Sequence, residues 1–271
     1  MPELPEVETI KRDLSFLTSS QLKALEVYDR PYLEKNSISL SSLKALEGQT
    51  LVRLSRKGKY LFFHFSRSTL GFHLGLTGSL TLNDSDETIH NHKHKVLRLD
   101  FSQGMILFSD MRKFGKIFHF IDDEGFSKFL NQIGPDALEI ELSEFKECLK
   151  KHTKPIKSVF LDQKIISGIG NIYADEILFR AGISPLRPAN ILSEDELQKL
   201  YKVMKDVLNL AIELRGSTIK DYVDGFGRHG MFQTQHLVYQ KYGKPCPRCG
   251  NVIEKTIVSG RTTSFCPKCQ R

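Results

Sequence analysis

The first residues of the chain could do chemistry that no internal residue can. Pro2 follows Met1, and the initiator methionine is normally removed before so small a residue, which would leave the Pro2 amine at the N-terminus. An α-amino group titrates at about 7.7–8.0, roughly two units below lysine, so part of it is an unprotonated nucleophile at neutral pH. Such a secondary amine can attack an electrophilic carbon and form an iminium. Glu3 and Glu6 are close enough in sequence to donate or accept a proton at the same centre.

The same stretch is also typical of the start of an ordinary amphipathic helix. Pro5 suits the first helical position, and acidic residues follow it in the first turn. Hydrophobic residues then recur at helical spacing: Val7, Ile10, Leu14 and Leu17. The sequence therefore predicts a helix from about Pro5, whether or not Pro2 is catalytic.

Four of the five cysteines form two Cys-x-x-Cys pairs near the end of the chain. Their number and spacing match a closed tetrahedral zinc site, and their clustering favours a metal over disulfides. The segment 236–271 carries four lysines and three arginines against Glu254 alone, so a zinc-bound finger remains basic. We expect one structural zinc ion with the ligands Cys246, Cys249, Cys266 and Cys269.

Composition narrows the classes of partner and location. The chain has 271 residues, 40% of them hydrophobic, which is enough for a buried core and for more than one domain. A formal net charge of +7 favours a polyanionic partner. No segment is long and apolar enough to cross a membrane, and acids stand where a secretory signal would carry lysines. We therefore expect a cytoplasmic protein that does not bind membranes.

Short strand-like runs dominate the first half of the chain. Residues 51–65 read as two strands joined by a basic turn that contains Lys59, whereas the stretch before them, through Ser41, reads as a polar connection. Alternation of apolar and polar residues over 96–101, with Gly and Ser between runs, predicts an antiparallel β-sandwich. The further strands expected are 72–74, 79–82, 105–108 and 117–120.

A Gly-Pro-Asp sequence at 134–136 marks a hinge, after which the composition turns helical. Helices are predicted over 145–151, 156–162 and from 193 to about 214. Gly168 and Gly170 precede Asn171, the expected N-cap of another helix, and backbone N–H groups at such a helix start suit a phosphate. The expected domains are 1–134 (β-sandwich), 135–235 (helical) and 236–271 (zinc ribbon).

The opening Met-Pro-Glu-Leu-Pro-Glu-Val-Glu-Thr resembles the N-terminus of bacterial formamidopyrimidine-DNA glycosylases, bifunctional enzymes that remove oxidised purines from DNA. The Gly-Lys-Tyr-Leu motif at 58–61, the Gly-Ile-Gly-Asn motif at 168–171 and the cysteine pairs extend the resemblance over essentially the whole chain. It implies an α+β fold: an N-terminal helix with an antiparallel catalytic β-sandwich, a helical DNA-binding domain with a helix-two-turn-helix, and a β-hairpin zinc ribbon.

The resemblance also implies roles for individual residues. Pro2 would form a Schiff base with the sugar of the damaged nucleotide, Glu3 would donate and shuttle protons, and Glu6 would support the site. Lys59 would hold the DNA backbone beside the lesion, and Arg261 at the tip of the zinc hairpin would complete the catalytic set. The residues expected to bind DNA are Leu76, Arg112, Phe114, Lys157, Asn171 and Lys220.

Two positions depart from the family pattern. An enzyme that extrudes a base must fill the hole left in the stack, and an apolar wedge with an arginine suits that task. Arg112 and Phe114 match the family's residues for it, but Leu76 stands where the family has methionine. Arg215 replaces the first of a common glycine pair, just before the stretch 216–222 and the glycine-rich loop 224–230, which the resemblance implies close over the extruded base.

The expected function is excision of 8-oxoguanine and formamidopyrimidines from double-stranded DNA, followed by strand cleavage through β,δ-elimination. The expected protein is a cytoplasmic monomer associated with the nucleoid. Two alternatives stay open. One is an endonuclease VIII-like glycosylase for oxidised pyrimidines, against which Leu4 argues because that class typically has glycine there. The other is a non-catalytic zinc-ribbon DNA-binding protein, which would not need a proline amine beside two glutamates.

Overall fold

The computed structural model describes residues 2–83, 87, 89 and 92–271, so Met1, whose removal we expect, lies outside the described residues. The chain divides into two compact units. The first consists of Met1–Asn131 and Leu214–Met231, and the second of Gln132–Glu213 and Phe232–Arg271. This division differs from our predicted boundaries. The segment Leu214–Met231 returns to the sandwich because carboxylates of the first helix bind it, and the zinc ribbon packs within the second unit.

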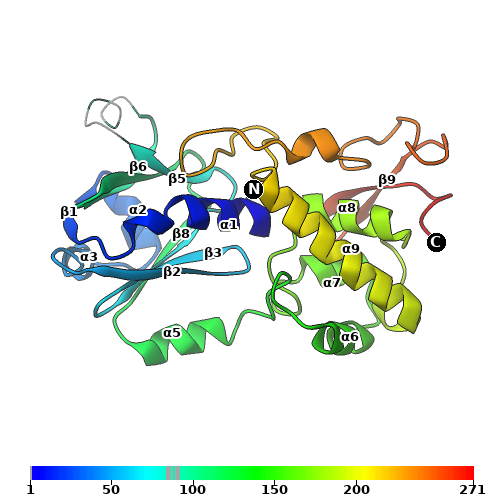
Figure 1. Ribbon diagram of the computed structural model, residues 1–271, viewed down its shortest axis with the longest axis horizontal. Helices are drawn as coiled ribbons and strands as arrows, with labels where there is room; N and C mark the ends of the chain where they lie inside the picture. Colours follow the sequence, from blue (N-terminus) through cyan, green and yellow to red (C-terminus); the bar gives the residue numbers. More distant parts are fainter. Residues whose placement is uncertain (1, 84–86, 88, 90–91) are drawn as a thin grey trace. The chain divides into compact units, whose positions relative to one another are not determined.

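The first unit is an antiparallel β-sandwich with one helix at its start, as the sequence predicts (Figure 1). Helix α1 (Leu4–Asp13) has Glu3 as its N-cap and a proline in its first turn. One sheet has the order β1-β6-β7-β5 and the other β2-β3-β4-β8. The strands are β1 (Leu22–Val27), β2 (Leu51–Lys57), β3 (Tyr60–Phe65), β4 (Thr69–His73), β5 (Gly78–Asn83), β6 (Lys95–Phe101), β7 (Gly104–Asp110) and β8 (Lys116–Phe120).

The stretch between α1 and β2, predicted as a polar connection, is structured instead. It contains η1 (Ser15–Leu17), β1, α2 (Arg30–Lys35) and α3 (Leu40–Lys44). The register of β1 against β6 shifts between Leu22 and Ala24, so the strand lacks the strict alternation by which a strand is recognised. Helix α5 (Asp123–Leu130) also escaped prediction, because none of its residues is buried.

The main core of the first unit gathers side chains from α1 and both sheets. Val7 and Ile10 of α1 belong to the same buried cluster as Phe63 and Phe72 of the neighbouring sheet. On this sheet a second group of aromatic rings contacts α5; the ring centroids of Phe62 and Phe126, for example, lie 5.1 Å apart. Helix α1 is thus fixed against the sheet whose strands β2 and β3 form the predicted basic hairpin.

The second unit contains helices and a two-stranded hairpin. The helices are α6 (Leu142–Lys150), α7 (Ile156–Leu161), α8 (Asn171–Ala181) and α9 (Glu194–Glu213), with short 3-10 turns η2 (Ala189–Ile191) and η3 (Phe232–Gln235). Strands β9 (Glu254–Val258) and β10 (Arg261–Phe265) pair antiparallel. The N-cap of α8 is Gly170, so Asn171 is the first helical residue and not the cap we expected. Among the described residues, no helix combines the length and apolar character needed to span a membrane.

Two neighbouring acids on α8 hold the C-terminal part of the chain. Glu176 is fully buried and accepts the backbone N–H groups of Leu237, Val238 and Tyr239 at 2.9 to 3.0 Å. Asp175 binds the hairpin strand β10 through the N–H of Ser264 at 3.1 Å. Because successive helical residues point about 100° apart, the two carboxylates anchor two different segments to one helix.

We predict that Glu176→Ala destabilises the second unit by roughly 3–5 kcal/mol, because three backbone N–H groups lose their acceptor in a buried place. The loss of stability is measured by urea unfolding, and hydrogen exchange in residues 171–181 and 237–239 locates it in the second unit. The matched control is Glu147→Ala on α6, whose ion pair with Lys151 is exposed. That change should alter stability by less than about 0.5 kcal/mol. Equal losses in the two variants would contradict the anchoring role of Glu176.

Candidate active site

The N-terminal residues are buried, and Glu6 holds them in place. Glu3 is only 2% exposed, and Pro2 is buried beside it. The Oε2 atom of Glu6 accepts the backbone N–H of Glu3 at 2.8 Å, while its Oε1 atom accepts the N–H of Ser217 at 2.7 Å. A Cβ atom on Gly216 would lie 2.7 Å from Oε1, so glycine is needed for this close approach. Glu6 therefore joins the start of α1 to the backbone of a distant segment.

Lys59 lies in the turn between β2 and β3, and α1 fixes this turn as well. Lys59 is 5% exposed. The guanidinium of the neighbouring Arg56 donates to Glu8 Oε2 of α1 at 3.0 Å and to the carbonyl of Gly58 at 3.0 Å. Burial acts to raise the pKa of Glu8, but the charges of Arg56 and Lys11 outweigh it and hold the pKa below its usual value. An ionised Glu8 thus positions the hairpin that carries Lys59.

The strand register collects three candidate segments at one end of the sheet. Tyr60 pairs with His73 across β3 and β4, and His73 pairs with Lys116 across β4 and β8. The Lys59 turn precedes Tyr60, the loop with Leu76 follows His73, and the loop with Arg112 and Phe114 precedes Lys116. These segments therefore lie at the same end of the sheet.

The two loops predicted to contact DNA are bound to each other through Asp110, which is buried. Its carboxylate accepts the hydroxyl of Thr77 at 2.7 Å and the N–H of Gly115 at 2.7 Å. The Thr77 hydroxyl in turn accepts the N–H of Arg112 at 2.9 Å. A Cβ atom on Gly75 would lie 2.4 Å from the backbone of Phe114, so the loops are in direct contact.

The predicted wedge residues differ in exposure. Phe114 is 51% exposed, and the guanidinium carbon of Arg112 lies 5.1 Å from the centroid of its ring. Leu76 is half-buried on the adjoining loop. The structure thus brings the three residues together, two of them open to a partner. Sequence reasoning missed Asp110, whose only signal was a carboxylate at the end of a buried strand.

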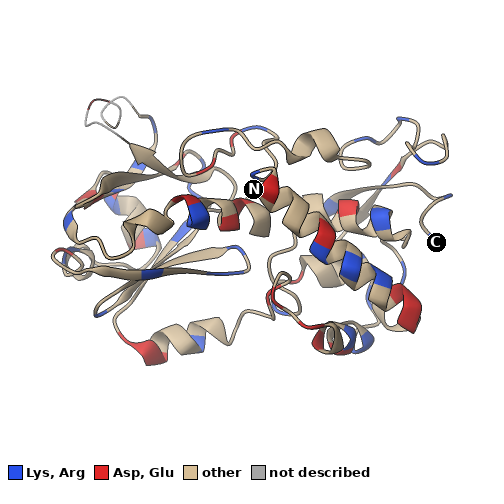
Figure 2. Ribbon diagram, in the orientation of Figure 1, with Lys and Arg blue, Asp and Glu red and all other residues tan. Residues whose placement is uncertain are grey.

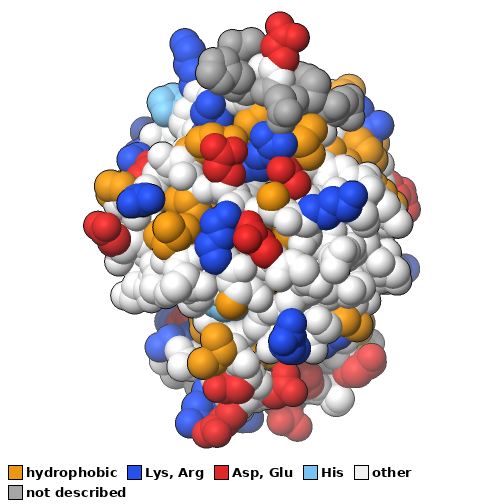
Figure 3. All heavy atoms as spheres, turned by 90° about the vertical axis from the view of Figure 1, so that its left-hand side faces the viewer, with side chains coloured by type: hydrophobic (Ala, Val, Ile, Leu, Met, Phe, Trp, Pro, Cys, Tyr) orange, Lys and Arg blue, Asp and Glu red, His pale blue; other side chains and the backbone are white. Residues whose placement is uncertain are grey.

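Charges in the first unit are distributed unevenly. Figure 2 shows both acidic and basic positions along α1, whereas the β2–β3 hairpin carries only basic ones, at Arg53, Arg56, Lys57 and Lys59. On the face shown in Figure 3, acidic and basic side chains are intermixed. Arg56 is bound to Glu8 and Lys59 is buried, so Arg53 and Lys57 are the two of these cations that are more open to a polyanion.

In the second unit, Arg261 is exposed and Lys157 is not. Arg261 follows the Ser259-Gly260 turn, whose two residues have φ values of 49° and 70°, as a tight two-residue hairpin requires. Lys157, predicted as a phosphate contact, is fully buried; its Nζ lies 2.7 Å from Asp175 Oδ1. The prediction that Lys157 contacts a DNA phosphate therefore needs correction. A buried charge needs a partner of opposite charge, and Asp175 is that partner inside the protein.

Lys157 and Asn171 both bind the hairpin that carries Arg261. Lys157 Nζ donates to the hydroxyl of Thr263 at 2.8 Å, and Asn171 Nδ2 donates to the carbonyl of Thr262 at 3.0 Å. These contacts tie α7 and α8 to the residues directly after Arg261. Lys220, the remaining predicted DNA contact, is exposed in the Leu214–Met231 segment of the first unit.

The four cysteines fit one zinc ion. Their sulfur atoms all lie within 4.8 Å of one another, with Cys246 and Cys269 at 3.9 Å and Cys249 and Cys266 at 3.6 Å. Zn–S bonds of about 2.3 Å in a tetrahedron imply sulfur separations of roughly 3.8 Å. Phe179 of α8 packs in the same buried cluster as Cys246 and Cys266. The cysteine tetrad is thus a closed structural site attached to α8.

We predict that His73 makes stability depend on pH. Burial, together with the charges of Lys59 and Lys116, lowers its pKa from 6.5 to about 4. Its neutral Nδ1 accepts the N–H of Gly75 at 3.3 Å. The stabilising contribution is fully present above pH 6.5 and is lost as pH falls towards 4. His73→Asn should therefore lose less stability than wild type between pH 6.5 and 4 in thermal melts. The same loss in both proteins would show that His73 is not responsible.

Models of known protein families match three parts of the chain. The formamidopyrimidine-DNA glycosylase N-terminal domain matches residues 1–117, and the H2TH domain of the same enzymes matches 133–223. A zinc finger found in FPG and IleRS matches 243–271, which includes the four cysteines. The cofactor expected from the cysteine spacing, one structural zinc ion, agrees with this match and with the sulfur geometry.

Individual relatives are similar to this chain along essentially its full length. A formamidopyrimidine-DNA glycosylase from Carboxydothermus hydrogenoformans is 43% identical over 275 residues, covering 100% of both chains. One from Bacillus subtilis is 38% identical and covers 100% of this chain and 99% of its own.

Solved structures show the same fold. A mutant of the Lactococcus lactis FPG in complex with Fapy-dG containing DNA has a TM-score of 0.89 at 36% identity, covering 100% of both chains. The wild-type Lactococcus lactis FPG, solved with DNA that contains an oxidised pyrimidine, has a TM-score of 0.88 at 36% identity over 100% of both chains. With its β-sandwich, buried N-terminal Pro2-Glu3 and four-cysteine ribbon, the chain belongs to the formamidopyrimidine-DNA glycosylase family of DNA repair enzymes.

Proposed function

We propose that this protein removes oxidised purines from duplex DNA and then cuts the strand at the resulting abasic site, with Pro2 as the nucleophile. The observation that carries the proposal is the N-terminus itself, where Glu6 holds Glu3 next to Pro2 in a buried setting. The Lactococcus lactis relative was solved with a formamidopyrimidine lesion, which supports the same substrate class here.

The first step exchanges one bond at the sugar carbon C1′ for another. The lone pair of the Pro2 amine forms a bond to C1′, and the glycosidic bond breaks so that the base leaves with its electrons. The attacking nitrogen then gives up its N–H proton, which neutralises the departing base. Glu3 gives a proton to the ring oxygen O4′ as the freed nitrogen lone pair opens the C1′–O4′ bond and leaves an iminium between Pro2 and the sugar. Burial of Glu3 suits this role because it keeps water from competing for the proton.

The iminium then makes strand cleavage possible. It withdraws electrons from C2′, so that loss of a C2′ proton expels the phosphate on the 3′ side, and a second elimination expels the phosphate on the 5′ side. Glu3 shuttles protons in these steps. Lys59, in a turn fixed by Arg56 and Glu8, holds a phosphate of the cleaved strand. Arg261 binds DNA from the zinc hairpin. Its exposed position beside the turn leaves its guanidinium accessible to a phosphate.

The remaining residues bind and deform the duplex. Phe114, Arg112 and Leu76 fill the space that the extruded base leaves, since they lie on two loops bound together by Asp110. Lys220 and Asn171 contribute contacts to the DNA backbone. A zinc ion held by Cys246, Cys249, Cys266 and Cys269 would have its four positions filled by thiolates, so it would stabilise the hairpin that carries Arg261 and would supply no chemistry.

An oxidised-pyrimidine activity is a second candidate, because the Lactococcus lactis relative was also solved with an oxidised pyrimidine. Borohydride reduces an iminium and leaves the enzyme covalently attached to DNA. Trapping on duplexes with 8-oxoguanine or with an oxidised pyrimidine compares the two substrates directly. A non-catalytic zinc-ribbon protein would be trapped on neither.

We predict that an N-terminal extension that turns the Pro2 amine into an amide abolishes both base removal and borohydride trapping, because an amide nitrogen is not nucleophilic. The dissociation constant for DNA should change little, since binding depends on phosphate contacts elsewhere. The control is the same tag at the C-terminus. If the N-terminally extended protein is still trapped, the nucleophile lies elsewhere, and Lys59 is the first residue to test.

A second prediction concerns the wedge. Leu76→Ala should slow removal of 8-oxoguanine by roughly ten-fold while slowing cleavage at a ready-made abasic site much less, because that site needs less extrusion of a base. Single-turnover rates on the two duplexes give the comparison. Leu80→Ala, at a buried position of β5, separates general destabilisation from loss of the wedge. Equal slowing of both reactions by Leu76→Ala would remove Leu76 from the wedge.

A further inference from the structure

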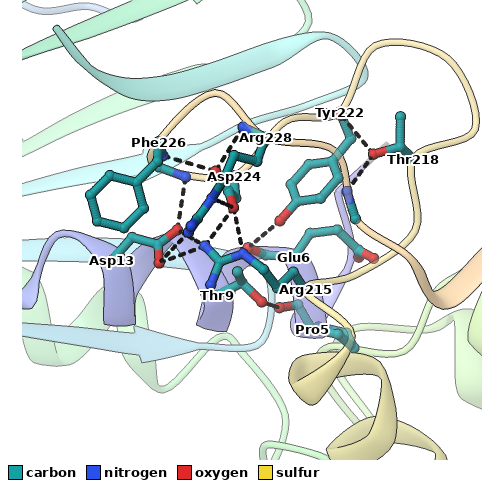
Figure 4. A network of polar contacts seen from close by, with 12 residues as sticks. Pro5, Glu6, Thr9, Asp13, Arg215, Thr218, Tyr222, Asp224, Phe226 and Arg228 are labelled. Atoms are coloured by element: carbon teal, nitrogen blue, oxygen red, sulfur yellow. Dashed lines mark hydrogen bonds and ion pairs between the residues drawn. The ribbon is translucent and has the colours of Figure 1, made fainter.

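A group of two aspartates and two arginines binds the returning segment Leu214–Met231 to α1 (Figure 4). Arg215 Nη2 donates to Asp13 Oδ1 at 2.7 Å, and Arg215 Nε donates to Asp224 Oδ2 at 2.5 Å. Arg228 adds an exposed second cation, with Nε 3.1 Å from Asp224 Oδ2. Arg215 therefore joins the end of α1 to the glycine-rich loop.

The two carboxylates also bind backbone, so the group holds more than side chains. Asp13 Oδ2 accepts the N–H of Gly225 at 3.0 Å. Asp224 is fully buried, and its Oδ1 accepts the N–H groups of Phe226 and Arg228 at 2.9 Å. Burial acts to raise the pKa of Asp224, but these N–H groups and the Arg215 charge outweigh it and keep the carboxyl ionised. The loop is thus fastened to Asp13 at one point and folded around Asp224 at another.

The backbone of Arg215 makes the arrangement more unusual. Its φ angle is 61°, in the left-handed region where glycine is favoured and a side chain is strained. Gly216, which follows it, also has a positive φ of 80°. An arginine occupies a position whose backbone favours glycine, and the hydrogen bonds of its side chain to Asp13 and Asp224 offset that strain. The contacts of the side chain therefore explain why an arginine stands at a position where the backbone favours glycine.

The group is connected to the candidate active site through Glu6. Arg215 is two residues before Ser217, whose N–H binds Glu6 Oε1, while the other oxygen of Glu6 binds the N–H of Glu3. Asp13 and Glu6 are two turns apart on the same helix, so the segment is held at both ends of α1. Displacement of Arg215 would shift Ser217 and with it the hydrogen bond that keeps Glu6, and hence Glu3, in place.

We propose that Arg215 is a positioning residue, which holds the Gly216-Ser217 backbone against Glu6 by binding Asp13 and Asp224 and so keeps Pro2 and Glu3 aligned for attack. The inference rests on the proposed function and adds to it a contact that depends on this chain's own arginine. Arg215 does not touch the reacting atoms and acts only through Ser217 and Glu6.

The test compares Arg215→Gly, Arg215→Lys and wild type. Glycine suits the left-handed backbone, so Arg215→Gly removes the side chain without adding strain. We expect the Ser217 amide to exchange with solvent faster in this variant. We also expect single-turnover base removal to slow roughly ten- to hundred-fold, with the dissociation constant for duplex DNA within about two-fold of wild type. Arg215→Lys keeps one charge but cannot bridge both carboxylates, so it should recover only part of the rate.

The matched control is Ser37→Gly, because Ser37 is exposed in the same unit and also has a positive φ, of 57°. It should leave Ser217 exchange and base removal unchanged. Wild-type rates in Arg215→Gly would overturn the proposal, and so would slower base removal with unchanged Ser217 exchange, because Arg215 would then act by another route. A wild-type protein without base removal would overturn the proposed function instead, while Ser217 exchange would still decide whether Arg215 holds that backbone.

Discussion

The first unit depends on carboxylates that α1 buries. An ionised carboxylate removed from water is costly unless opposite charges or N–H groups satisfy it. Glu6 binds the Ser217 backbone, Glu8 binds Arg56 of the β2–β3 hairpin, and Asp13 binds Arg215. Together these contacts hold two segments on one helix: the β2–β3 hairpin and the segment Leu214–Met231. Helix α1 therefore positions the other segments of the candidate site, and its N-cap Glu3 directly follows Pro2 in the chain.

The second unit uses the same principle on α8. Asp175 and Glu176 are adjacent and buried, and they hold the hairpin strand β10 and the 237–239 backbone respectively. The cysteine tetrad closes the ribbon at its other end. A small hairpin has too little core to be stable alone, so its exposed Arg261 is positioned by a metal site and by a buried ion pair together.

Features with a local signal were predictable from the sequence, and features that join distant segments were not. The cysteine pairs follow from their spacing, the β2–β3 hairpin from two strand-like runs around a basic turn, and the start of α1 from Pro5. The partner of Glu6 could not be found in this way, because Ser217 is 211 positions away and contributes only a backbone N–H. Lys157 shows another limit. On the short, largely buried helix α7, residue type alone does not reveal that a lysine points inward to Asp175.

The discontinuous first unit has a consequence for the order in which the protein is made. Glu6 and Asp13 are synthesised before α6 to α9, whereas their partners Ser217 and Arg215 follow these helices in the chain. At 5–20 residues per second, the ribosome needs on the order of 10 s to pass from Asn131 to Leu214. During that interval Glu6 and Asp13 do not yet have these partners, whereas Glu8 already has Arg56. The contacts that hold Glu6 and Asp13 can thus form only after residues 132–213 of the second unit have been translated.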